Sequence, residues 1–424
     1  MRIILQDIIK RSAMPSYMAL NKKEKKELMT MQNFEFRNPT KIIFGKGTEN
    51  EVGKECSRYS KKVLLHYGKG SVVRSGLLDR VKKSLEAAEV GYVELGGVQP
   101  NPRISLVRKA IALCKREDVG FILAVGGGSV IDSAKATAMG LKYDGDVWDL
   151  YAKTAEPQGA VGVGVVLTIP AAGSESSNSS VLTNEEEGLK RSCDSDDIYP
   201  KFSILNPELT YSMPKYQIAC GSVDIMAHIM ERYFTQTMHN SVSDRMAEAL
   251  LRNMIEFAPK ALEEPLNYDY RAEVMWNGTL AHNNLINCGR QADWASHPIE
   301  HELSTEYDMA HGGGLAIVYP AFMKYVYKQR LSQFIRFATA VWNVEYDRND
   351  PAATAYEGIV RLERFFRSLG LPTTLEDAGL DYDDAKLRFL AERCDRNELG
   401  KVGHFVELET DDVEKIYHLA KKEG

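Results

Sequence analysis

The sequence is poor in cysteine and contains no long apolar run. Only six of its 424 residues are cysteines, and no two of them form a CxxC pair. A chain of this length can bury a large core without disulfides, so the cysteines favour reduced thiols in a cytoplasmic protein. No apolar stretch approaches the roughly 20 residues that are needed to cross a bilayer. We therefore expect no membrane contact.

The sequence also lacks an excess of positive charge, because its formal net charge is -6. Nucleic-acid-binding proteins need a basic surface, so the composition argues against a nucleic-acid partner. Hydrophobic residues make up 44% and charged residues 26% of the chain, which is typical of a globular protein. The length favours two domains rather than one.

The pattern of apolar residues changes near residue 206. Before it, short apolar runs at 41–44, 62–67, 120–125 and 162–170 alternate with helix-like segments at 76–88 and 104–117. Strands that are apolar on both faces and are separated by helices indicate a parallel α/β sheet. After it, helical patterns follow at 223–234, 241–262, 270–284, 331–341, 352–369 and 383–393. We predict an N-terminal extension over 1–32, in which Met31 is an alternative first residue, an α/β domain over 33–205 and an all-α domain over 206–424.

Three glycines, Gly126, Gly127 and Gly128, and then Ser129 follow directly after an apolar run of strand length. Glycine lets the backbone approach a ligand closely, and free N–H groups at the start of a helix attract phosphate. The pattern differs from the GxGxxG fingerprint. It predicts a site for a dinucleotide pyrophosphate, with a plain β–α turn as the alternative.

A second glycine turn follows the apolar run at 62–67. It consists of Gly68, Lys69, Gly70 and Ser71. Taken alone it is equally typical of a simple turn.

A possible metal site is indicated by one aspartate and several histidines. Asp224 and His228 lie four residues apart, so on a helix they share one face. His297 and His301 repeat that spacing, and His311 follows. One carboxylate with two or three imidazoles suits a divalent cation such as Fe²⁺ or Zn²⁺, which can polarise a carbonyl as a Lewis acid. Spacing nominates His297 with His301, and His301 with His311 is also possible; packed histidines without a metal are the alternative.

Together these motifs, with Thr168-Ile-Pro170 and Gly173-Ser-Glu175, resemble the iron-containing (group III) alcohol dehydrogenases. The resemblance is greatest to the butanol dehydrogenase and broad-specificity aldehyde reductase branch, and it runs from about Asn33 to the C-terminus. It implies a dinucleotide-binding α/β N-terminal domain, an all-α metal-binding C-terminal domain, an active site between them and a homodimer. The implied reaction transfers hydride between a nicotinamide cofactor and a small aliphatic aldehyde/alcohol pair such as butanal/butanol.

The resemblance also implies roles for individual residues. The metal ligands would be Asp224, His228, His297 and His311, which leaves His301 as a catalytic residue near the nicotinamide or the substrate. The turn at Gly126–Ser129 would hold the pyrophosphate. Around the cofactor the family pattern places Thr168 at the adenosine side or the pyrophosphate, Asp132 near the nicotinamide end, and Lys190 where the family has a cofactor-contacting lysine.

Two positions bear on the cofactor and on the metal ligands. NAD-preferring relatives have an aspartate in the turn at 68–71, whereas this chain has Lys69 beside Ser71, and a cation with a hydroxyl suits a 2′-phosphate. We therefore expect NADP(H) to be preferred over NAD(H). The run Gly312–Gly314 after His311 is glycine-rich for this branch, and we expect it to loosen the segment that carries His311.

Three other functions remain as alternatives. A glycerol-dehydrogenase-like polyol oxidoreductase would share the domain plan and differ in its metal ligands. A metal-dependent hydrolase would use the same aspartate and histidines without a nicotinamide. A nucleotide-binding module would carry out no catalysis, and NADPH titration separates the hydrolase from the nicotinamide-binding possibilities.

Overall fold

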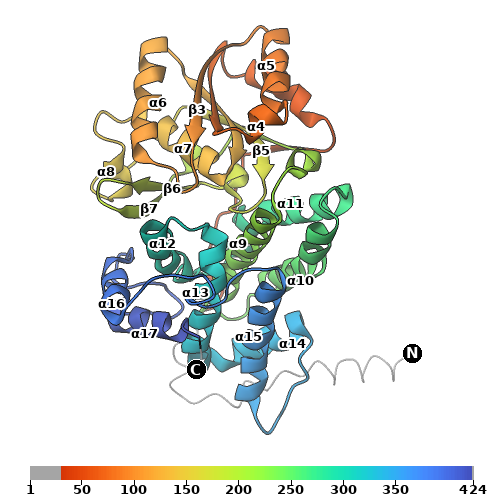
Figure 1. Cartoon of the computed structure of the whole chain (residues 1–424), viewed down its shortest axis with the longest axis vertical. Coiled ribbons are helices and arrows are strands. Elements are labelled where there is room, and N and C mark those ends of the chain that lie inside the picture. The colour runs from red at the N-terminus through yellow and green to blue at the C-terminus, as the bar shows by residue number, and fades with distance from the viewer. Residues whose placement is uncertain (1–29, 423–424) are drawn as a thin grey trace.

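The computed structural model describes residues 30–422, which form an α/β half and a helical half, one above the other in Figure 1. Most of the extension predicted for residues 1–32 lies outside the described residues. The first regular element, β1, begins at Lys41. The α/β N-terminal half and the helical C-terminal half confirm the predicted fold class. The predicted boundary between residues 205 and 206 falls directly after the last strand of the sheet.

A six-stranded sheet organises the α/β half, in the order β1-β8-β5-β4-β2-β3. All neighbouring strands are parallel. The strands are β1 (Lys41–Phe44), β2 (Lys62–Gly68), β3 (Gly91–Val98), β4 (Phe121–Gly127), β5 (Gly162–Ile169) and β8 (Phe202–Leu205). The apolar runs predicted as strands are therefore confirmed as strands of one parallel sheet.

Helices cover both faces of this sheet, as its apolar pattern predicts. Alternation along β2 sends Val63 and Leu65 to one apolar cluster and Leu64 to another. The helices of this half are α3 (Val52–Cys56), α4 (Ser71–Arg74), α5 (Leu77–Ala87), α6 (Ile104–Glu117), α7 (Gly128–Gly140) and α8 (Trp148–Tyr151). Because β2 pairs with β4, with Tyr67 opposite Val125, the two glycine turns lie side by side at the carboxyl edge of the sheet.

A two-stranded antiparallel hairpin, which the sequence did not predict, consists of β6 (Ser179–Asn184) and β7 (Leu189–Asp194). β6 contains two serines and an asparagine, and β7 contains a lysine, an arginine and an aspartate, so neither strand has an extended apolar run. β6 packs on α7, while β7 contacts the helical half at α12. The hairpin therefore connects the two halves.

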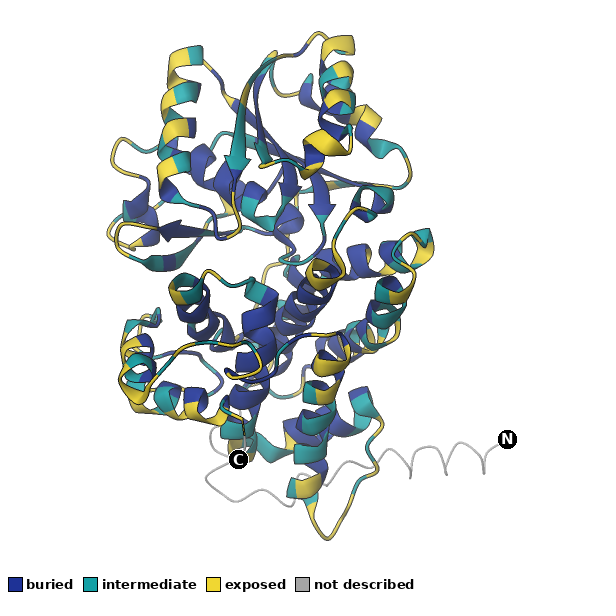
Figure 2. Cartoon of the chain, viewed as in Figure 1, coloured by how far each residue is buried: buried dark blue, intermediate teal, exposed yellow. Residues whose placement is uncertain are grey.

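The helical half packs around two central helices, α9 and α13, which are almost entirely buried (Figure 2). α13 contacts α9, α12, α15 and α17. The helices are α9 (Lys215–Tyr233), α10 (Ser241–Glu263), α11 (Tyr268–His282), α12 (Ser296–Tyr307), α13 (His311–Val326), α14 (Leu331–Trp342), α15 (Pro351–Ser368), α16 (Asp384–Arg393) and α17 (Thr410–Leu419). Among residues 30–422, no helix is both long and apolar enough to cross a membrane.

Most helices predicted after residue 206 are confirmed, although α9 begins at Lys215 rather than at 223. α12, α13 and α17 were not predicted. α13 contains three glycines and Pro320, residues that are unfavourable in isolated helices. Burial in the core overrides that unfavourable propensity.

Candidate active site

A cavity of about 1030 Å³ lies between the two halves. It exceeds the range of roughly 300–1,000 Å³ that is typical of small-molecule sites, which leaves room for a dinucleotide and a small substrate. The cavity is lined by every residue that the sequence nominated: Gly68, Lys69, Gly70, Ser71, Gly126, Gly127, Gly128, Ser129, Asp132, Thr168, Lys190, Asp224, His228, His297, His301 and His311. The nominated residues of both halves thus face one space.

The glycines where β4 ends and α7 begins are required partly by packing within the protein. A Cβ atom on Gly126 would lie 2.4 Å from Val130, and one on Gly127 would lie 2.8 Å from Ile169. Gly128 and Ser129 begin helix α7, and both line the cavity. The first N–H groups of a helix have no partner within that helix and favour anions. The turn can therefore offer main-chain donors to a phosphate group.

The second glycine turn adds positive charge at the same edge of the sheet. Lys69, Ser71 and Arg74 all line the cavity. A Cβ atom on Gly70 would lie 2.7 Å from Nη1 of Arg74, so this guanidinium group lies against the turn. Arg74 was not predicted, because an arginine on a short helix carries no local signal of a ligand. Two cations and a hydroxyl suit a phosphate dianion.

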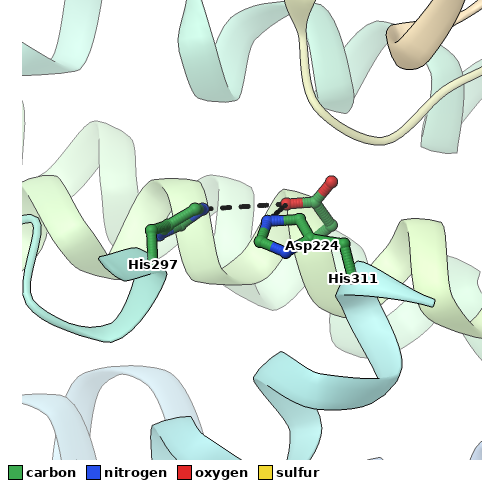
Figure 3. Close-up of side chains that lie close together, drawn as sticks. All are labelled: Asp224, His297 and His311. Atoms are coloured by element: carbon green, nitrogen blue, oxygen red, sulfur yellow. Dashed lines mark ion pairs between the residues drawn. The ribbon is translucent and has the colours of Figure 1, made fainter. Parts of the chain in front are cut away.

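Asp224 of α9, His297 of α12 and His311 at the start of α13 converge at the helical side of the cavity (Figure 3). Their ligand atoms lie within 4.8 Å of one another. Asp224 Oδ1 is 3.9 Å from His297 Nε2 and 3.8 Å from His311 Nε2. Among residues 30–422, neither Asp224 Oδ1 nor His297 Nε2 has a hydrogen-bond partner, although both are buried. Buried oxygen and nitrogen atoms that lack hydrogen-bond partners and face one another are suited to bind a divalent cation.

His228 lies beside this group of three. Its ring centroid is 4.6 Å from that of His297. Its Nδ1 donates to the main-chain oxygen of Asp224 at 2.8 Å and lies 3.0 Å from the Asp224 carboxylate oxygen Oδ1. Because Nδ1 is occupied, Nε2 is the nitrogen that can bind an ion. His228 therefore has a suitable tautomer, and its role as the fourth ligand stays a prediction.

Charge interactions within the cluster are strong. Burial acts to raise the pKa of Asp224, but the neighbouring His228, His297 and His311 hold it well below its usual range. Burial acts to lower the pKa of His297, yet the negative charge of Asp224 and the hydrogen bond and charge of Glu231 raise it to about 9. Without a metal, a proton on His297 thus offsets part of the carboxylate charge.

His301 lines the cavity on α12, with its ring centroid 5.4 Å from that of His311. Burial and the nearby charge of Lys190 hold its pKa well below the ordinary value, so its imidazole is neutral at physiological pH. Glu300, His301 and His311 form a second group whose ligand atoms lie within 4.8 Å of one another. Of the two histidine pairs that spacing left open, the structure therefore groups His301 with His311, whereas His297 groups with His311 and not with His301.

The remaining nominated residues lie on the α/β side of the cavity. Thr168 stands near the end of β5. The Asp132 carboxylate accepts hydrogen bonds from Ser174 Oγ at 2.6 Å and Val181 N at 3.2 Å. Lys190 Nζ donates to Asn101 Oδ1 at 3.1 Å and lies 3.9 Å from Glu300 Oε2. Lys190 thus reaches from β7 into the helical half.

The expectation that Gly312–Gly314 loosens the segment carrying His311 is wrong. These glycines lie in the first turn of α13, and all are buried. A Cβ atom on Gly312 would lie 2.0 Å from the main-chain oxygen of Cys220, and one on Gly314 would lie 2.4 Å from Glu300 Oε1. The glycines therefore allow α13 to pack closely against α9 and α12, which fixes the position of His311.

Two aromatic residues of the cavity were also missed. The ring centroid of His282, at the end of α11, lies 4.3 Å from that of His228, and its Nδ1 hydrogen-bonds to the Ala172 carbonyl. Trp294 lines the cavity beside His297 and has a φ of 58°, a left-handed conformation that is rare for a bulky residue. Neither has a sequence spacing that sets it apart from a packed core residue.

Comparisons with known proteins agree on one family. Residues 39–207 match "Iron-containing alcohol dehydrogenase", and residues 218–421 match "Fe-containing alcohol dehydrogenase family, C-terminal". The chain is 44% identical to the probable NADH-dependent butanol dehydrogenase 1 of Bacillus subtilis, over 91% of this chain and 99% of that protein. It is 37% identical to the NADPH-dependent aldehyde reductase YqhD of Escherichia coli, over 92% of this chain and 100% of that protein.

Solved structures show the same relationship. The crystal structure of the NADH-dependent butanol dehydrogenase A from Thermotoga maritima superposes with a TM-score of 0.88 at 38% identity. The match covers 93% of this chain and all of that one.

Proposed function

We propose, from the premise that the chain belongs to the iron-containing alcohol dehydrogenase family, that it interconverts small aliphatic aldehydes and alcohols such as butanal and butanol. It is a metal-dependent oxidoreductase with a nicotinamide cofactor: the family's description gives the metal, and the relatives' names give the cofactor. One observation carries the proposal: Asp224, His297 and His311 converge on the cavity that both glycine turns also line.

The residues have separate tasks in this proposal. When bound, a divalent cation supplies Lewis acidity to the substrate oxygen, and the nicotinamide supplies or accepts hydride. Asp224, His228, His297 and His311 would hold the cation. Main-chain N–H groups at Gly128 and Ser129 would hold the pyrophosphate. His301 offers a neutral imidazole nitrogen for the proton that the alcohol oxygen gains or loses.

NADP(H) is the proposed cofactor. Lys69, Ser71 and Arg74 place two cations and a hydroxyl at the glycine turn that a 2′-phosphate would approach. The relatives differ, since the Bacillus subtilis protein is named NADH-dependent and the Escherichia coli protein NADPH-dependent. The charge of this turn is the reason to favour NADP(H) here.

Elemental analysis of the purified protein, combined with initial rates of butanal reduction, tests this function. We expect one equivalent of Fe²⁺, Zn²⁺ or a similar divalent metal, and a higher kcat/KM for NADPH than for NADH. Fluorescence titration that shows no NADPH binding would contradict the proposal and favour a hydrolase. Faster oxidation of glycerol than of butanol would favour the polyol oxidoreductase.

A homodimer in the cytoplasm completes the proposal. β1 is an edge strand of the sheet, and Phe44 at its end lies 6.1 Å from Trp276 between ring centroids. Both side chains are exposed, as are Phe34 and Phe36 in the segment that leads to β1. An apolar surface beside an edge strand is typical of an interface. Light scattering should give the mass of a dimer for the wild type and of a monomer for Phe44→Lys.

All six cysteines are unpaired, which suits a reducing compartment such as the cytoplasm.

A further inference from the structure

Glu231 is completely buried on α9, behind His297. Its Oε1 accepts a hydrogen bond from His297 Nδ1 at 2.9 Å and one from His297 N at 3.3 Å. Its Oε2 accepts from the main-chain N–H of Trp294 at 2.9 Å. One carboxylate therefore fixes both the imidazole of His297 and the chain that leads into α12.

Glu300 is completely buried on α12 and stands in the same relation to His311. Its Oε2 accepts a hydrogen bond from His311 Nδ1, and its Oε1 accepts one from Ser304 Oγ. Lys190 Nζ lies 3.9 Å from Oε2. Within residues 30–422, Lys190 and His311 are the two residues that form ion pairs with Glu300. Gly314 provides the space for this carboxylate.

The two glutamates repeat one arrangement on different helices. In each, a carboxylate accepts from Nδ1 of an imidazole whose Nε2 faces Asp224 Oδ1. A hydrogen bond at Nδ1 holds the tautomer in which Nε2 is free to bind a cation, and a charged acceptor makes that nitrogen a stronger donor. His228 differs, because its Nδ1 donates to the main-chain oxygen of Asp224 and lies 3.0 Å from Oδ1 of the same residue instead of contacting a glutamate.

We propose that Glu231 and Glu300 are positioning residues that set the affinity of this site for its divalent cation. They orient the imidazoles of His297 and His311, and they add negative charge behind both rings in a buried environment where it is poorly screened. The proposal rests on the proposed function in one respect, since it takes the cluster around Asp224 to be the metal site.

Glu231→Gln and Glu300→Gln test the proposal in the full-length protein. Each keeps the shape of the side chain and an acceptor oxygen but removes the charge. We expect the dissociation constant for Zn²⁺, measured by competition with a chromophoric chelator, to rise about 10- to 100-fold in each variant. The visible spectrum of the Co²⁺-loaded protein should also change, because it reports on ligand geometry and donation.

Glu302→Gln is the matched control. Glu302 is also buried on α12, but its carboxylate pairs with Arg191 at 3.2 Å and Arg393 at 3.5 Å instead of with a ligand imidazole. This variant should keep the wild-type Zn²⁺ affinity and Co²⁺ spectrum even where its unfolding temperature falls. Wild-type affinity in Glu231→Gln and Glu300→Gln, or an equal loss in Glu302→Gln, would overturn the inference alone. A wild-type protein that binds no divalent cation would overturn the proposed function with it.

Discussion

The α/β half and the helical half present different chemistry to the same cavity. The α/β half offers main-chain N–H groups at turns where a Cβ atom would collide with the protein. The helical half offers side chains from α9, α12 and α13, which are brought together only by packing. A main-chain site depends on the local sequence, whereas a side-chain site depends on the tertiary fold. Substitutions in one half should therefore weaken binding of the cofactor or of the metal, but not of both.

His311→Ala should give the largest effect and the clearest separation. Loss of a ligand should remove the metal and lower NADPH-linked butanal reduction by about three orders of magnitude, because Lewis-acid stabilisation is worth several kcal/mol. The NADPH dissociation constant, from fluorescence titration, should stay close to that of the wild type. Retention of metal and activity would remove His311 from the site, and loss of NADPH binding would break the separation between the halves.

Gly312→Ala tests whether close helix packing fixes the metal side. A Cβ atom there meets the Cys220 oxygen, so we expect a loss of about 1–3 kcal/mol in the free energy of unfolding, together with weaker metal retention. Gly120→Ala is the control, because a Cβ atom at Gly120 has no neighbour within 4 Å. Equal unfolding free energies for both variants, measured by denaturant titration, would show that α13 has freedom to move.

Histidine is used differently in the two halves, and pH should reveal it. His66 of β2 is fully buried between the Leu95 oxygen and Ser133 Oγ, and burial lowers its pKa to about 4. The pKa of a histidine in the unfolded chain is near 6.5. As the pH falls from about 6.5 to about 4, the unfolded state therefore binds a proton that the folded state does not. The free energy of unfolding decreases over this range, by on the order of 3 kcal/mol in total. The free energy of unfolding of His66→Gln should lack this loss. An identical pH dependence in both proteins would contradict the assignment.

Lys69→Asp should have the smallest effect, confined to the α/β half. Lys69 is exposed, so its attraction for a 2′-phosphate is modest, and we expect the NADPH/NADH ratio of kcat/KM to fall about five- to tenfold. The metal content should not change. Lys61→Asp makes the same charge change at an exposed lysine that does not line the cavity, and it should leave the ratio unaltered. Equal ratios in both variants would remove Lys69 from the cofactor site.

Much of the fold could be predicted because its signals are local. The apolar runs at β2, β4 and β5 and the glycines at the end of β4 are each contiguous in sequence, so they can be recognised without knowledge of tertiary contacts. α13 escaped prediction because Gly312–Gly314 and Pro320 oppose a helix locally, and only contact with α9 and α12 makes glycine necessary. The polar strands β6 and β7 escaped for a similar reason, since their contacts with α7 and α12 do not show in their own residues.

The candidate site divides in the same way. Asp224 with His228 and His297 with His301 could be nominated, because their spacing places each pair on one face of a helix. Spacing alone could not choose among the histidines, and it gave no sign of Glu231, Glu300 or Trp294. A buried glutamate that backs an imidazole from another helix looks, in sequence, like any other glutamate on a helix.

An anomalous-scattering crystal structure of the protein loaded with a divalent metal and NADPH tests the central claim most directly. We predict a single metal peak at about 2.0–2.2 Å from a carboxylate oxygen of Asp224 and from Nε2 of His228, His297 and His311. The cofactor pyrophosphate should lie at the start of α7. A peak held by Glu300, His301 and His311 without Asp224, or a pyrophosphate bound away from Gly128, would contradict it.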